Sequence, residues 1–264
     1  MLSYEHICKT FNPGTPDAVT LFDDFNLTVD DGEFVSIIGS NGSGKTTMLN
    51  LLCGSLPVDS GKIIVDGNDI THLAEYRRAS HIGRVFQDPK AGTCSDLTIL
   101  ENMALADNKK RRYGLTPAVS RARIDAYREM LAQCGMGLEE RLHAKVGTLS
   151  GGQRQALTLL MATINPPKLL LLDEHTAALD PGTAEKVLEL TKQIVAENHL
   201  TCLMITHNMA SALELGNRTI MMDRGHIIHD AAGQQRDGLT VEKLLQEFKN
   251  ASGAALDNDR MLLT

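Results

Sequence analysis

The sequence contains no apolar stretch long enough to cross a lipid bilayer. A membrane-spanning helix needs about 20 consecutive apolar residues, whereas the longest apolar run, residues 169–172, has the length of a strand. The amino terminus carries charged residues and lacks both the apolar segment and the cleavage site of a secretion signal. We therefore expect the chain to stay inside the cell and to act at a membrane only through a partner chain.

The sequence also lacks an excess of positive charge. Its 33 acidic residues outnumber its 26 lysines and arginines, which leaves a formal net charge of −7. A protein that holds nucleic acid gains most of its affinity by neutralising phosphates with basic side chains. We therefore do not expect nucleic acid to be a partner.

The sequence also lacks cysteines in close pairs. No two cysteines lie close together in the sequence, and none has a histidine at the spacing of a metal site. This pattern indicates reduced, structural thiols in a cytosolic protein. The five cysteines are Cys8, Cys53, Cys94, Cys134 and Cys202.

Apolar runs of strand length recur along the chain of 264 residues, which is long enough for one large domain or for a core with an inserted subdomain. Several runs are apolar at successive positions, as in strands covered on both faces. Helical patterns at 46–53 and 183–196 separate some of them, which is the rhythm of an α/β fold with a mostly parallel sheet. The expected strands are 34–38, 63–65, 82–86, 169–172, 202–205, 219–222 and 227–228.

The middle of the chain has a different pattern. Between about residues 88 and 165 the β-branched runs disappear, and amphipathic segments such as 120–133 and 153–164 take their place. We expect a helical subdomain inserted into the α/β core. The basic cluster at 109–112 is interpreted as a solvated loop, and the segment after 239 as a short helix with a polar end.

One segment matches the pattern of a phosphate-binding loop, with a strand pattern before it and a helical pattern after it. Its glycines let backbone N–H groups converge on an anion, and the following helix adds its positive end. Lys45 would reach the β- and γ-phosphates and Thr46 would bind Mg²⁺. The alternative is a glycine turn that arose by chance. The segment consists of Gly39, Ser40, Asn41, Gly42, Ser43, Gly44, Lys45 and Thr46.

Two adjacent acids, Asp173 and Glu174, end the apolar run 169–172. A Mg²⁺-nucleotide site needs one carboxylate near the metal and another to activate the attacking water. Asp173 is assigned to the metal and Glu174 to the general base. The alternative is a solvated start of a loop.

A second helix start has the character of an anion site. It combines a hydroxyl with two glycines directly before the helical pattern 154–164. A simple helix cap would be the plainer interpretation. Its residues are Leu149, Ser150, Gly151, Gly152 and Gln153.

The order of phosphate loop, glutamine, LSGGQ, acidic strand end and late histidine resembles the nucleotide-binding subunit of ABC transporters, from Tyr4 to about Asp230. The resemblance implies a P-loop NTPase with a RecA-like core of mostly parallel sheet (1–87 and 166–240) and an N-terminal antiparallel β part. It also implies an α-helical subdomain (88–165) and a C-terminal helix and tail (241–264). Two copies would dimerise head to tail, so that each ATP lies between the Lys45 loop of one and the Ser150 helix of the other.

The resemblance assigns further roles residue by residue. Gln87 matches the glutamine that contacts Mg²⁺ and the attacking water, and His207 matches the switch histidine at the γ-phosphate. Asp180 matches the loop that couples the two sites of the dimer, and Thr47 joins the ATP-binding set. Phe11 takes the place of the aromatic residue that stacks on adenine, with Tyr4 as the alternative and core packing as the plainer interpretation of Phe11.

The chain departs from the usual family pattern at His175, where proline is common, and at Ala177, where serine is common. The resemblance favours an importer of the amino-acid type at the cytoplasmic face of the membrane, with integral membrane permease subunits and an extracytoplasmic substrate-binding protein as partners. Three alternatives stay open. They are an exporter subunit, a soluble ABC ATPase of the iron–sulfur cluster assembly type, and a module that binds nucleotide without hydrolysing it.

Overall fold

A computed structural model describes residues 1–110 and 118–252 of the chain. The chain divides into two compact units, Met1–His81 with Thr201–Thr264, and Ile82–Leu200. Of the basic cluster at 109–112, Lys109 and Lys110 belong to a short 3₁₀ turn, Asn108–Lys110. Arg111 and Arg112 lie outside the described residues, as does the polar end expected after 252.

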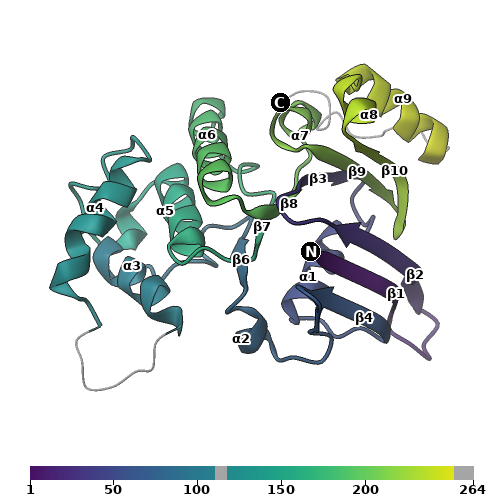
Figure 1. The fold of residues 1–264 in the computed structure, drawn as a ribbon, viewed down its shortest axis with the longest axis horizontal. Coiled ribbons are helices and arrows are strands. Elements are labelled where there is room, and N and C mark those ends of the chain that lie inside the picture. Colours follow the sequence, from purple (N-terminus) through teal and green to yellow (C-terminus); the bar gives the residue numbers. More distant parts are fainter. Residues whose placement is uncertain (111–117, 253–264) are drawn as a thin grey trace. The chain divides into compact units, whose positions relative to one another are not determined.

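The first unit contains an antiparallel sheet built mainly from the amino terminus. Its strands are β1 (Leu2–Phe11), β2 (Val19–Val29), β4 (Ser60–Val65) and β5 (Asn68–Asp69), in the order β2-β1-β4-β5. Figure 1 labels the three long strands β2, β1 and β4. All neighbours in it are antiparallel. The inward side chains of β2, including Phe22 and Phe25, are buried, whereas Asp23 and Asp24 are exposed. This one-sided pattern is typical of an antiparallel sheet and confirms the predicted antiparallel part.

A second sheet of the same unit is mostly parallel. Strand β3 (Phe34–Gly39) lies between β8 (Thr201–Ile205) and β9 (Arg218–Asp223), parallel to both, and β10 (His226–Ala232) pairs antiparallel with β9. Every residue of β3 and β8 is buried. The runs of successive apolar residues in the sequence therefore did mark strands covered on both faces.

Five helices complete the described part of the first unit. They are α1 (Lys45–Cys53), α2 (Glu75–Arg78), α7 (Met209–Leu215), α8 (Gln234–Asp237) and α9 (Val241–Ser252). Leu244 and Phe248 of α9 are buried in one apolar cluster with Met209, Ala212 and Met221. This burial explains why the segment after 239 forms a helix on the unit.

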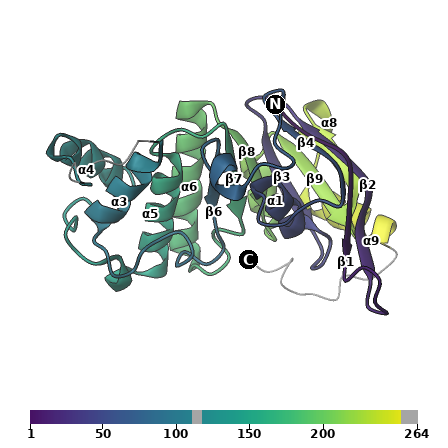
Figure 2. The same ribbon diagram turned by 90° about the horizontal axis from the view of Figure 1, so that it is seen from below.

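The second unit is predominantly helical. It holds α3 (Ile99–Asp107), α4 (Ile124–Ala132), α5 (Gly151–Thr163) and α6 (Pro181–Asn198), together with the parallel strands β6 (Ile82–Val85) and β7 (Leu169–Asp173) (Figure 2). The predicted helical segment 88–165 lies within it. Among residues 1–110 and 118–252, no helix is both long enough and apolar enough to cross a bilayer.

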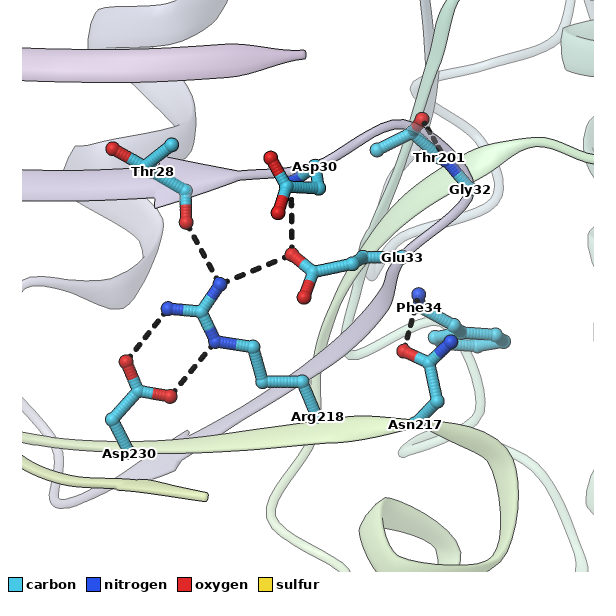
Figure 3. A network of polar contacts seen from close by, with 9 residues as sticks. All are labelled: Thr28, Asp30, Gly32, Glu33, Phe34, Thr201, Asn217, Arg218 and Asp230. Atoms are coloured by element: carbon cyan, nitrogen blue, oxygen red, sulfur yellow. Dashed lines mark hydrogen bonds and ion pairs between the residues drawn. The ribbon is translucent and has the colours of Figure 1, made fainter. Parts of the chain in front are cut away.

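Arg218 on β9 ties several strands of the first unit together (Figure 3). Its guanidinium donates to both carboxylate oxygens of Asp230 on β10, at 2.8 and 2.6 Å, and also to Glu33 at 3.0 Å and to the carbonyl of Thr28 at 2.8 Å. Hydrogen bonding to Asp230 raises the pKa of Arg218 further. The sequence alone did not point to this network, because its members come from four separate segments.

Candidate functional site

The predicted phosphate loop connects β3 to α1 in the first unit. Gly39 has a φ of 152°, and a Cβ there would lie 2.2 Å from the carbonyl oxygen of Met222. Gly44 has a φ of 103°, and a Cβ there would lie 2.9 Å from the ring of Phe22. Both positions therefore require glycine, because they combine a backbone conformation that side chains disfavour with no room for one.

Lys45 is buried inside this loop. Its Nζ donates to the carbonyl oxygens of Gly39 and Ser40, at 2.9 Å each. The first turn of α1 contains no acidic residue that would repel an anion. The ammonium group of Lys45 and the positive end of the helix would both attract one. This arrangement fits a polyphosphate.

The end of β9 and the turn that follows it hold the phosphate loop from outside the motif. The hydroxyl of Ser40 donates to Asp223 Oδ1 at 2.9 Å, and the N–H of Gly225 donates to the carbonyl of Ser43 at 2.9 Å. Sequence reasoning missed Asp223 and Gly225. Nothing local to residues 223–225 distinguishes them from any turn between two strands.

The acidic strand end lies in the second unit, where Asp173 is the last residue of β7 and is 7% exposed. Arg84 of β6 donates to Asp173 Oδ2 at 2.8 Å. The guanidinium of Arg84 also lies 4.7 Å from the centre of the Phe86 ring. A buried carboxylate is costly unless it is paired, and the Arg84 guanidinium provides such a partner for Asp173.

The side chains of Glu174 and Gln87 contact each other in the second unit. The amide Nε2 of Gln87 donates to Glu174 Oε2 at 3.1 Å. Glu174 has a φ of 47°, in the left-handed region that residues other than glycine seldom adopt. Such conformations gather at functional sites, where the surrounding structure holds them in place.

Ser150 is the N-cap of α5, which begins at Gly151 rather than at the predicted residue 153 or 154. The Ser150 hydroxyl accepts from the N–H of Gln153 at 3.2 Å, and the Gln153 side chain accepts from the N–H of Ser150 at 3.2 Å. This reciprocal capping box starts the helix earlier. Ser150 and Gly151 are exposed, Gln153 is half-buried, and Leu149 is buried, so a cap and an exposed helix start coexist here.

Gly152 lies against the neighbouring helix. A Cβ there would be 1.9 Å from Cγ2 of Thr183 in α6, whereas a Cβ at Gly151 would meet only Leu179, at 3.7 Å. The second glycine of the motif therefore serves the packing of α5 on α6 within the second unit.

Asp180 is the N-cap of α6, and its Oδ1 accepts from the N–H of Thr183 at 3.0 Å. Hydrogen bonds from Thr183, first from its side chain and then from its backbone N–H, hold the pKa of Asp180 below its usual value.

His207 is half-buried, two residues beyond the end of β8 in the first unit.

The two aromatic candidates for adenine stacking have different environments. Tyr4 is 1% exposed, and its hydroxyl donates to the carbonyl of Met48 at 3.1 Å, so its ring belongs to the core. Phe11 is half-buried at the end of β1, and Lys9 Nζ lies 6.0 Å from the centre of its ring. Phe11 stays the candidate for stacking.

The donors proposed for Mg²⁺ fit that ion chemically. Thr46 offers a hydroxyl, Gln87 an amide oxygen and Asp173 a carboxylate, and hard oxygen donors are those that Mg²⁺ prefers. Thr46 lies in the first unit and is exposed, whereas Gln87 and Asp173 lie in the second. Each of these three side chains therefore offers, in its own unit, the kind of oxygen donor that Mg²⁺ prefers.

Comparison with known proteins identifies similar chains. The family model described as "ABC transporter" matches residues 22–177. A tyrosine transport ATP-binding protein of Clostridioides difficile is 46% identical over 253 residues, which cover 95% of this chain and 100% of the relative. The spermidine/putrescine import ATP-binding protein PotA of Pasteurella multocida is 37% identical over 218 residues, or 82% of this chain. This chain spans about half of the PotA sequence, 55% of its length.

A similar structure has also been solved. It is the dimeric, post-hydrolysis state of an ATP-binding cassette bound to ADP and phosphate, with a TM-score of 0.76 and 30% sequence identity. The match covers 88% of this chain and 98% of the other.

Proposed function

This chain belongs to the ABC transporter family and is an ATP-hydrolysing subunit, and from that premise we propose that it powers the import of an amino acid. The observation that carries the proposal is the 46% identity to a tyrosine transport subunit across the full length of that relative. Tyrosine is accordingly the first candidate substrate.

Uptake of labelled tyrosine in cells that depend on this chain tests the proposal. Cells that lack the chain should lose saturable tyrosine uptake. The wild-type chain should restore it and a Glu174→Gln variant should not. Unchanged tyrosine uptake in the deleted strain, with loss of spermidine or methionine uptake instead, would overturn the assignment to tyrosine.

For hydrolysis, we assign the triphosphate to the phosphate loop, with Lys45 at the β- and γ-phosphates. Glu174 is the general base that accepts the proton of the attacking water, and Gln87, its hydrogen-bond partner, orients that water. His207 contacts the γ-phosphate, and Phe11 stacks on adenine. The ATP-binding residues are Phe11, Gly39, Ser40, Asn41, Gly42, Ser43, Gly44, Lys45, Thr46 and Thr47.

We assign Mg²⁺ to Thr46, Gln87 and Asp173. When bound, this ion neutralises charge on the phosphates. Arg84 donates a hydrogen bond to the Asp173 carboxylate and fixes its direction at the end of β7.

We propose that two copies of the chain act head to tail, with the Ser150 helix start of one copy at the ATP of the other and Asp180 coupling the two sites. Support comes from the dimeric solved cassette and from the exposed start of α5. In a mixed dimer, replacing Ser150 in one copy should impair turnover at the Lys45 loop of its partner. Unimpaired turnover at that loop would contradict this arrangement. The residues assigned to the trans contact are Leu149, Ser150, Gly151, Gly152 and Gln153.

We place this dimer at the cytoplasmic face of the membrane, beneath integral membrane permease subunits that work with an extracytoplasmic substrate-binding protein. The supporting observation is again the family of transport subunits to which the chain belongs. Purification of the tagged chain from membranes should bring the permease with it. Recovery of the chain without any membrane protein would contradict this placement.

A further inference from the structure

His175 directly follows the proposed base, Glu174, and is buried in the second unit. It is 3% exposed, and its Nε2 lies 3.2 Å from Oγ1 of Thr191, a fully buried residue of α6. Proline, common here in the family, would fix the local backbone but could offer no hydrogen bond to a helix. His175 therefore supplies a contact that proline cannot make.

The direction of this hydrogen bond follows from the second contact of Thr191. The Thr191 hydroxyl donates to the carbonyl of Val187 at 2.7 Å. A hydroxyl has one hydrogen, so Oγ1 accepts from His175 and the imidazole carries its proton on Nε2.

The backbone at Glu174 adopts a conformation that contacts with the surrounding structure must hold in place. Its φ of 47° lies in the left-handed region, which is unfavourable for a residue other than glycine unless the surrounding structure holds it. Its carbonyl accepts from the N–H of Ala177 at 3.0 Å, and its carboxylate accepts from Gln87 at 3.1 Å. His175 connects the same short segment to α6, one residue from the carboxylate. Small displacements of a reacting group cost much of the rate.

We infer that His175 is a positioning residue for hydrolysis. Its hydrogen bond to Thr191 fastens the segment that carries Glu174 to α6 and holds the base carboxylate in the orientation that activates water. The inference rests on the proposed role of Glu174 as the base.

Thr191→Val tests it, because valine keeps the shape of threonine and removes the acceptor. We expect kcat for ATP hydrolysis to fall about ten-fold while KM for ATP changes less than about two-fold. Thr163→Val is the matched control, since Thr163 of α5 is also buried and donates to a carbonyl four residues earlier, that of Leu159 at 2.8 Å. The control should keep the wild-type kcat.

A second pair of variants separates positioning from stability. Leucine at 175 together with valine at 191 removes both polar partners, which is far less costly than leaving one unpaired. In the double variant His175→Leu with Thr191→Val, the thermal midpoint should recover while kcat stays low. His175→Gln places an amide N–H near the position of Nε2 and should retain more activity than His175→Asn.

Two results would overturn the inference: a kcat of Thr191→Val equal to that of Thr163→Val, or a kcat that recovers with stability in the apolar double variant. Glu174→Gln, assayed in parallel, keeps the two proposals apart. Hydrolysis that persists in Glu174→Gln refutes the base itself, whereas loss there with full activity in Thr191→Val refutes only the role of His175.

Discussion

The hydroxyl of Ser40 in the phosphate loop donates a hydrogen bond of 2.9 Å to Asp223, the last residue of β9. The two residues are 183 positions apart in the sequence. The turn that follows β9 also contacts the loop, through Gly225, whose N–H donates to the carbonyl of Ser43. The shape of the phosphate loop therefore depends on a hairpin outside the motif.

Asp223→Ala should weaken ATP binding. A hydrogen bond to a charged group contributes about 1.5 to 3 kcal/mol, of which a part should appear as a roughly three- to thirty-fold rise in Kd for ATP. Ser40→Ala should have a similar effect, and the double variant should be little worse than either single one. Titration with a fluorescent ATP analogue measures this. Additive effects of the two changes would show that the pair does not act as a unit.

The ion pair of Arg84 with Asp173 should matter far more for stability than the surface pair of Arg128 with Asp125. The side chains of the first pair are 13% and 10% exposed, and those of the second 52% and 86%. Arg84→Met removes the cationic partner of a buried carboxylate and should cost about 3 to 5 kcal/mol of unfolding free energy. Arg128→Met should stay within about 0.5 kcal/mol of wild type. Urea denaturation measures both free energies of unfolding. Equal losses in the two variants would contradict the expected difference between a buried and an exposed ion pair.

The two glycines at the start of α5 should respond differently to alanine. Gly152→Ala places a Cβ 1.9 Å from Cγ2 of Thr183 and should lower the thermal midpoint by several degrees, corresponding to about 1 to 3 kcal/mol. Gly151→Ala meets no such neighbour and should be neutral or stabilising. Adding Thr183→Ser, which deletes Cγ2, should restore much of the loss in Gly152→Ala. If the thermal midpoint of Gly152→Ala stays low when residue 183 is serine, the contact with Cγ2 of Thr183 is not the cause of the loss.

Asp180 should make stability depend on pH in the acid range. Its pKa is lowered in the folded state by hydrogen bonds from Thr183, so the folded state favours the ionised form. This contribution is present above the unfolded pKa, near 3.8, and is lost as pH falls through the lower, folded pKa. The advantage in thermal midpoint of wild type over Asp180→Asn should therefore be larger at pH 6 than at pH 3. A difference in thermal midpoint that grows toward pH 3 would contradict the predicted direction of this pH dependence.

The sequence predicted those parts of the molecule that depend on local pattern. Successive apolar residues marked β3, β7 and β8, because strands covered on both faces have no polar side. The glycine-rich segment before α1 and the two acids at the end of β7 were recognisable because the chemistry predicted for them requires fixed residue types at fixed spacing.

Contacts between distant segments could not be predicted in this way. Arg84 and Asp223 are ordinary residues in their own segments, and only the fold brings them to Asp173 and Ser40. Tyr4 and Phe11 have similar aromatic side chains at the two ends of β1, and only their burial separates a core residue from a candidate for stacking. The start of α5 was placed late because its glycines have low helix propensity, which the capping box of Ser150 and Gln153 overrides.

We propose that Glu174 accepts the proton of the water that attacks ATP, and replacing it by glutamine tests this role. ATP affinity and steady-state phosphate release should be measured on the same preparation, with wild type beside it. We expect an ATP affinity within about three-fold of wild type and a turnover at least about 100-fold lower. Phosphate release at the wild-type rate from Glu174→Gln would contradict the account.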